Sequence, residues 1–162
     1  MTAGVTCGVA TNGAAANCGQ DIFESMKYAC ATAKTAANDP RALTAARALR
    51  MATVEGACAI RVPETGSIEV GKRADLITVD TKQAHLTPLL DPVKALVYSA
   101  RGGDVRDAVI DGRVVMRDRQ VLTVDEDALL VEVEQAARCC AARAGLSLPR
   151  ADPARLAASP HA

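Results

Sequence analysis

The sequence predicts an α/β protein, in which helical segments come first and short strands follow. Residues 21–34 carry apolar side chains every three or four positions, which is typical of a helix with one buried face. Two apolar runs, 105–110 and 113–116, flank Asp111-Gly112. This dipeptide favours a two-residue hairpin turn, because both central positions of that turn need a positive φ.

The first part of the chain is predicted to hold one short strand and further helices. The apolar run 5–10 is predicted to be a buried strand that ends in a loop. Asp39-Pro40 is predicted to start a helix that continues to Ala59, with Thr44 as a rival cap. Gly56 indicates either a break between two short helices or a point of close packing.

The second part is predicted to contain strands and two helices. Strands are expected at 66–70 and 74–80, on either side of Gly71, and Asp91-Pro92 is expected to open a helix over 93–100. A capping box at residues 123–126 predicts a C-terminal helix.

Local details of this second part lead to further expectations. Gly145 is expected to stop the C-terminal helix, and one of the adjacent Cys139 and Cys140 is expected to face inward. Asp75 is expected to bond within its loop or strand edge. Arg119 stands where a positive φ is common, which predicts a different turn there.

Length and charge exclude several classes of protein. The chain has 162 residues, fewer than the roughly 250 of a complete (β/α)8 barrel. Its formal net charge of zero predicts no nucleic-acid binding, and no apolar run is long enough to predict a membrane span. Six scattered cysteines without a CxxC pair, and the lack of a signal-peptide pattern, predict reduced thiols and a cytoplasmic location.

Five motifs, which follow one another over about residues 5–125, carry a resemblance to a known family. They read GVATNGAAAN, DIFESMKYA, ALRMATVEGA, GSIEVGKRADLITVD and HLTPLLDPVKALVYSARGGDVRDAVIDGRVV. In this order they resemble the C-terminal portion of the amidohydrolase superfamily, in the branch of methylthioadenosine/S-adenosylhomocysteine deaminases and triazine hydrolases (chlorohydrolases). The resemblance implies the last βα element of a TIM-type barrel, the C-terminal strands of the small β-domain that flanks it, and a C-terminal helix.

The resemblance also implies how the chain is divided. Residues 1–60 are expected to be the remnant of the C-terminal βα elements and helices of the barrel, and residues 61–122 the C-terminal part of the small β-domain. Residues 123–145 are expected to form the C-terminal helix, and residues 146–162 a disordered tail. Relatives also draw strands of the β-domain from their N-terminus, so an open sheet edge and an exposed apolar face are expected here.

The family motif places a metal ligand at Asn12. Relatives hold zinc or iron through a His-x-His pair, later histidines and the Asp of a Thr-Asp-Gly motif, which reads Thr11-Asn12-Gly13 here. A neutral amide is a weaker ligand than a carboxylate and cannot act as a base at neutral pH. Asn17 falls in the loop that borders the substrate in relatives.

The histidine count does not match a family metal site. The sequence has two histidines, His85 and His161, and no His-x-His pair. A single histidine cannot hold zinc without partners, so His85 is expected to have a structural or solvent-facing role.

The resemblance implies a hydrolase of carbon–nitrogen bonds, other than peptide bonds, in purine- or triazine-like rings. The isolated chain is expected to be inactive, with no catalytic residue and no cofactor of its own. A second polypeptide that supplies the barrel, a further copy of the chain and a small heterocyclic substrate are the expected partners. The alternative is a non-catalytic, truncated or degenerate paralogue that pairs with itself or with a full-length relative.

Overall fold

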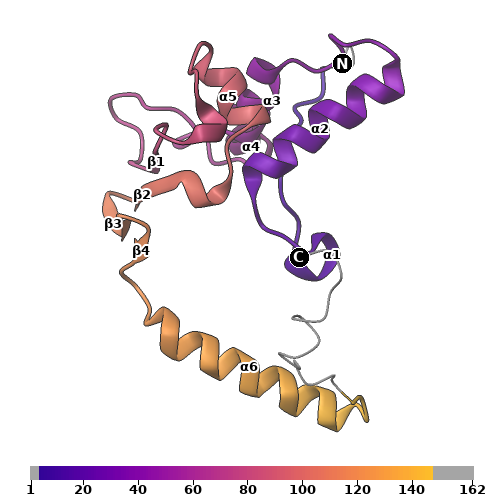
Figure 1. The fold of residues 1–162 in the computed structure, drawn as a ribbon. Coiled ribbons are helices and arrows are strands. Elements are labelled where there is room, and N and C mark those ends of the chain that lie inside the picture. The colour runs from indigo at the N-terminus through magenta and orange to yellow at the C-terminus, as the bar shows by residue number, and fades with distance from the viewer. Residues whose placement is uncertain (1–3, 148–162) are drawn as a thin grey trace. The chain divides into compact units, whose positions relative to one another are not determined.

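The structure is a computed structural model that describes residues 4–147. It divides into two units, residues 1–123 and residues 124–162. Figure 1 shows the helices and the small sheet of the first unit, and the single long helix of the second. No helix in the described part of the chain is both long enough and apolar enough to cross a membrane.

The described residues of the first unit form five α-helices. They are α1 (Ala14–Asn17), α2 (Ile22–Ala37), α3 (Ala45–Ala52), α4 (Val54–Ala59) and α5 (Pro92–Tyr98), with 3-10 turns η1 (Ala84–Leu86) and η2 (Gly102–Asp104). The Asp21 carboxylate caps α2. The Asp91 carboxylate caps α5, at the helix start that the sequence predicts. Thr44 caps α3, so the predicted helix start at Asp39-Pro40 is wrong. Asp39 instead accepts a hydrogen bond from the Arg41 amide, which forms a local turn before the helix.

Gly56 marks a point of close packing. The break between α3 and α4 lies at Thr53, whose φ and ψ of −124° and −106° are not helical. Gly56 itself lies within α4, where an added Cβ would come within 2.8 Å of the Met51 carbonyl oxygen. The α3–α4 corner therefore requires a residue without a side chain at position 56.

The core of the first unit lies between α2, α3 and α5. Met26 and Cys30 of α2 and Val97 of α5 are 0–2% exposed and are the largest fully buried side chains of the described residues. Lys34 of α2 also donates a hydrogen bond of 2.7 Å to the Tyr98 hydroxyl of α5. These contacts fix α2 against α5, the two helices that border the candidate site.

The strands form one antiparallel sheet in the order β1-β2-β3-β4. Their bounds are Leu76–Val79, Val105–Ile110, Arg113–Arg117 and Gln120–Val121. The predicted hairpin is confirmed, because Asp111 and Gly112 join β2 to β3 with φ values of 50° and 75°. Asp75 accepts a hydrogen bond of 2.6 Å from the Asp111 amide, so its predicted role at the strand edge is also confirmed.

Two predicted strands are absent from the described residues. Residues 5–10 are extended but pair with no strand. The Val9 amide instead donates a hydrogen bond to the Met51 carbonyl. Residues 66–70 form bends and turns, and Ile68 and Val70 are fully or almost fully exposed. An apolar run becomes a strand only where another strand accepts and donates its hydrogen bonds, and neither run has such a neighbour in the part of the chain described.

The turn between β3 and β4 keeps its handedness although Arg stands where Gly is common. Asp118 and Arg119 have φ values of 48° and 65°, so the prediction of a different turn is wrong. The Arg119 guanidinium donates to the Gly103 carbonyl (2.9 Å) and to the Asp80 carboxylate (3.1 Å). These contacts compensate for the backbone strain of a non-glycine residue at positive φ.

The sheet of the first unit has β1 and β4 at its edges and large apolar side chains in contact with solvent. Ile77 of β1 and Ile110 of β2 are 50% and 56% exposed, and Val114 of β3 is 39% exposed. This fits the predicted open edge and exposed apolar face.

The second unit consists of α6 (Glu126–Arg143) and the residues next to it. Asp125, not Thr123, caps this helix, because its carboxylate accepts a hydrogen bond from the Ala128 amide. Gly145 has a φ of 69° and ends the helix as predicted. Cys139 and Cys140 are both exposed, so the prediction that one faces inward is wrong. The predicted disordered tail lies outside the described residues, except for Leu146 and Ser147.

Candidate functional site

Asn12 lies in the loop between the extended segment 5–10 and α1. Its backbone adopts a φ of 60°, a conformation that Asn tolerates better than most residues. Its side-chain oxygen Oδ1 accepts a hydrogen bond of 2.7 Å from the amide of Gly13. The atom that a metal ion would need is therefore engaged by the neighbouring backbone.

Asn12 and Asn17 line the same hollow. Asn17 is the last residue of α1, and the short helix turns the chain back so that both amides border an open depression of about 300 Å³. Ser25 and Tyr28 of α2 form part of its wall. The structure thus places together the two residues that the family motif singles out, on a surface open to solvent.

The described residues do not fit the zinc or iron that the family implies. Among residues 4–147 there is no group of three or more His, Cys, Asp or Glu side chains that could hold a metal ion. Asn12 offers one neutral oxygen, which is already bonded to Gly13. Zinc sites in proteins need at least three protein ligands, so further ligands would have to come from other residues.

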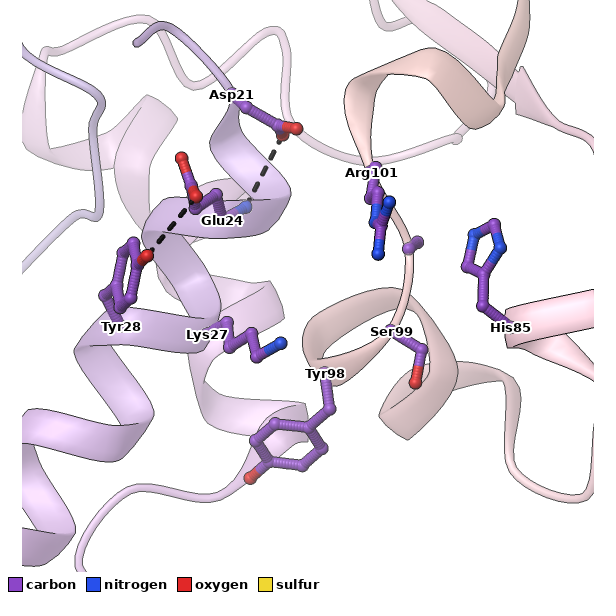
Figure 2. Close-up of a pocket in the computed structure, with 9 residues that line it drawn as sticks. Asp21, Glu24, Lys27, Tyr28, His85, Tyr98, Ser99 and Arg101 are labelled. Atoms are coloured by element: carbon purple, nitrogen blue, oxygen red, sulfur yellow. Dashed lines mark hydrogen bonds between the residues drawn. The ribbon is translucent and has the colours of Figure 1, made fainter. Parts of the chain in front are cut away.

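A larger cavity lies beside this hollow, between α2 and the segment that follows α5 (Figure 2). It has a volume of about 600 Å³ and a lining of both polar and apolar surface. Its titratable side chains are those of Asp21, Glu24, Lys27, Tyr28, His85, Tyr98 and Arg101. Tyr28 borders both this cavity and the hollow around Asn12, so the two depressions share a wall.

Asp104 organises one side of the cavity. Its carboxylate oxygen Oδ2 lies 2.9 Å from Nε2 of His85 and accepts a hydrogen bond of 2.9 Å from the Arg101 amide. Burial raises the pKa of the Asp104 carboxyl, but the hydrogen bonds from His85 and Arg101 outweigh burial and hold this pKa below its usual value. Asp104 is therefore ionised at neutral pH, and Nε2 of His85 carries the hydrogen that it donates. His85 thus has a structural partner, which fits its predicted role.

Asp21 connects the two sides of the cavity. Its oxygen Oδ1 accepts hydrogen bonds from the Phe23 and Glu24 amides at the start of α2, and its oxygen Oδ2 accepts one from the Gly102 amide. One carboxylate therefore holds the loop after α5 against the first turn of α2.

The cavity does not assemble a Ser-His-Asp triad. Ser99 lines the cavity with His85, but no hydrogen bond joins their side chains in the described part of the chain. A serine needs a base within hydrogen-bond reach to act as a nucleophile. Among the described residues, Ser99 is therefore not paired with His85 as nucleophile and base.

No sequence pattern indicates the hydrogen bond between His85 and Asp104. The two residues are 19 positions apart, in the 3-10 turns η1 and η2. Asp104 follows Gly102-Gly103, a pattern that predicts a turn and nothing about a buried carboxylate. Lys27 is an exposed lysine in an amphipathic helix, where a solvated role is the ordinary expectation.

The chain belongs to the amidohydrolase family, whose model matches residues 1–115. This confirms the predicted resemblance. The α/β fold, with a small antiparallel sheet and a C-terminal helix, is also confirmed.

Curated relatives are named as deaminases of adenine nucleosides. The 5′-deoxyadenosine deaminase of Methanosarcina acetivorans is 45% identical over 141 residues, which cover 87% of this chain and 32% of the relative. The 5-methylthioadenosine/S-adenosylhomocysteine deaminase of Pelotomaculum thermopropionicum is 42% identical over 137 residues, which cover 85% of this chain and 32% of the relative. The chain spans about a third of the length of these relatives.

Solved structures of zinc-containing enzymes share the fold of this chain. An adenosine deaminase from Xanthomonas campestris with bound zinc superposes with a TM-score of 0.74 at 39% identity, covering 76% of this chain and 28% of the other. The atrazine chlorohydrolase of Arthrobacter aurescens, complexed with zinc, superposes with a TM-score of 0.74 at 25% identity. The match covers 82% of this chain and 30% of the other.

Proposed function

We propose that this chain is the C-terminal portion of a metal-dependent hydrolase that releases an amino group from a purine-type ring. The observation that carries this proposal is the identity of 42–45% with deaminases of adenine nucleosides over more than four-fifths of the chain. Residues 1–60 would correspond to the last βα element of the barrel and the helices that follow it. The sheet β1–β4 would be the C-terminal part of the small β-domain. The similarity to a triazine-ring enzyme supports a heteroaromatic substrate more broadly.

We also propose that the chain has no hydrolase activity alone and gains it from a polypeptide that supplies the rest of the barrel. The Asn12 side-chain amide is a poor metal ligand, and its oxygen already accepts a hydrogen bond from the Gly13 backbone amide. The zinc or iron of the family would therefore be held mainly by residues of that second polypeptide. In such an assembly Asn12 and Asn17 would lie at the rim of the ring-binding site.

The test is reconstitution. The chain is purified alone, and it is also co-expressed with the part of the Methanosarcina acetivorans deaminase that the match does not cover. Ammonia release from 5′-deoxyadenosine is then measured with added zinc. The proposal expects no release by the chain alone and release by the co-purified pair. Release by the chain alone would overturn the proposed inactivity.

The geometry at Asn12 also favours a second candidate, a non-catalytic paralogue that pairs with itself or with a full-length relative. An amide at the family's carboxylate position would remove the proton-accepting group even in a complete barrel. The variant Asn12→Asp in the co-purified pair separates the two candidates. If the pair forms and is inactive with Asn12 but active with Asp, the chain is a non-catalytic partner. Activity with Asn12 itself favours the hydrolase.

A further inference from the structure

Helix α6 presents a row of apolar and small side chains to solvent. They follow one another at intervals of three and four residues, which places them along one face of the helix and its C-cap: Leu130, Val133, Ala137, Cys140 and Ala144. All five are exposed, and Leu130 and Val133 are 68% and 56% exposed. We call this face the α6 seam.

A helix of this length and exposure requires a partner for its apolar face. Figure 1 shows α6 as one uninterrupted helix, and it has 18 residues. Of these 18 residues, all of which the structure describes, Ala141 alone is buried. Isolated helices of such length are only marginally stable in water, because most helical stability in proteins comes from packing of an apolar face. The α6 seam is therefore expected to be covered.

The charges of α6 and its N-cap are divided between two halves. Residues 125–134 contain five acidic side chains and no cation, and residues 135–144 contain two arginines and no acid. The helix dipole favours acids in the first turn only, so it does not account for Glu132 and Glu134. The one ion pair of α6 within residues 4–147 joins Arg138 to Glu134, which leaves most of the acidic half unpaired.

This division of charge selects the orientation of a second, identical helix. Two copies of α6 that run in opposite directions place each acidic half beside a basic half. Two copies that run in the same direction place acids beside acids and arginines beside arginines, which is unfavourable. Charge complementarity therefore favours an antiparallel pair.

The side chains of the α6 seam are divided by size in the same way. The large ones, Leu130 and Val133, lie in the first half, and the small ones lie in the second. In an antiparallel pair Leu130 of one copy can lie opposite Cys140 of the other, and Val133 opposite Ala137, so each layer combines a large and a small side chain. A parallel pair would set Ala137 against Ala137 and leave a gap there.

We propose that α6 pairs with α6 of a second copy of this chain, in antiparallel orientation, through the α6 seam. The seam extends over about two heptads, so the association is weak, with an expected dissociation constant of roughly 100 μM. The inference goes beyond the proposed function, because it concerns the second unit alone and holds with or without hydrolase activity. It assigns a surface to the second copy that the sequence leads us to expect as a partner.

The first test measures the mass of the whole chain by sedimentation equilibrium under reducing conditions, from about 10 μM to about 1 mM. A shift from monomer to dimer is expected. Leu130→Gln is expected to weaken the dimer at least tenfold (about one decade), because it removes the largest side chain of the seam. Val131→Gln is the matched control, since Val131 is adjacent, 57% exposed and off the seam, and a change within about twofold is expected.

The second test determines the orientation. After mild oxidation, Leu130→Cys is expected to form a disulfide between position 130 of one copy and Cys140 of the other, identified by mass spectrometry of the linked peptides. Within one helix these positions lie about 15 Å apart, too far for a disulfide, so this bond reports the pair. Gln135→Cys is the control, because Gln135 lies on the opposite face of α6 and is expected not to link to Cys140.

A chain that stays monomeric throughout, or a dimer that Leu130→Gln and Val131→Gln weaken equally, would overturn the proposal. The α6 seam would then belong to another partner, such as the polypeptide that supplies the barrel. A disulfide that joins position 130 of both copies would overturn the antiparallel orientation. Both tests use the chain alone, without metal or substrate, so their failure is distinct from failure of the reconstitution experiment.

Discussion

The carboxylate of Asp21 accepts a hydrogen bond of 2.7 Å from the backbone amide of Gly102, which lies 81 residues further along the chain. The same side chain caps α2 through its other oxygen. A local helix cap and a long-range contact are thus combined in one residue. This contact ties the first helix of the core to the loop that leads into β2.

The two functions of Asp21 can be separated by substitution. Asp21→Asn keeps one carbonyl oxygen, which can cap α2 or meet Gly102 but not both, so unfolding is expected to become easier by about 1 kcal/mol. Asp21→Ala loses both contacts and is expected to cost about 2–3 kcal/mol. Urea denaturation followed by circular dichroism measures both changes. Equal losses for the two variants would mean that the contact that Asn retains contributes nothing.

Replacing Gly56 with Ala is expected to destabilise the protein, because position 56 has no room for a methyl group. The Cβ of Gly56→Ala would lie 2.8 Å from the Met51 carbonyl oxygen, so the corner between α3 and α4 must shift. A loss of about 1–3 kcal/mol in the free energy of unfolding is expected. Gly103→Ala is the control, because a Cβ there meets no atom within 4 Å. It is expected to change stability by less than about 1 kcal/mol, and a loss as large as that of Gly56→Ala would contradict the steric explanation.

Asn12→Asp in the isolated chain is expected to produce no deaminase activity. The substitution restores one carboxylate, but the sequence contains two histidines and the described residues hold no cluster that could complete a metal site. Ammonia release from 5′-deoxyadenosine with added zinc is the measurement, and the unchanged chain is the control. Turnover above that control would show that other residues complete the site.

Stability is expected to fall as the solution is made acidic, in part through Asp104. Hydrogen bonds from His85 and Arg101 overcome the effect of burial and hold the pKa of Asp104 below its ordinary value of 3.8. A carboxyl with a lowered folded pKa contributes stability that is complete above the ordinary pKa and is lost as the pH falls through the folded pKa.

The variant Asp104→Asn isolates this contribution. Urea midpoints measured from pH 6 to about pH 2 are expected to fall less steeply for the variant than for the original chain below about pH 4. Some slope is expected to remain, because hydrogen bonds from the Lys82 and Lys94 amides also lower the pKa values of Asp80 and Asp91. Parallel curves for the two proteins would exclude a contribution from Asp104.

The sequence predicts correctly those elements that a few adjacent residues determine by themselves. Asp91 and Pro92 sit at adjacent positions of one helix start, and Asp111 and Gly112 form one turn by themselves. The predicted strand at 5–10 fails because its hydrogen bonds depend on a neighbour that no local pattern can specify. Thr123 and Asp125 are both good caps, and only the observed hydrogen bond to Ala128 distinguishes them.

The same distinction between local and long-range contacts applies to the candidate site. Asn12 could be found because a family motif marks its position, whereas its engagement with Gly13 is a matter of backbone conformation. Asp104 and Arg101 are brought to His85 by the path of the chain around α5. Residue spacing cannot indicate a contact that depends on this path, so the cavity could not be predicted from the sequence.

The two-residue turns of the sheet have a consequence for the order in which it folds. The turns at 111–112 and 118–119 bring β2, β3 and β4 together after closing very short loops, so this meander can form within about 1–10 μs. Thr78 of β1 meets Asp107 of β2 across 29 residues, and closing that loop costs more chain entropy. The meander is therefore expected to be a nucleus that forms early, and β1 to join it only when the segment containing α5 has condensed.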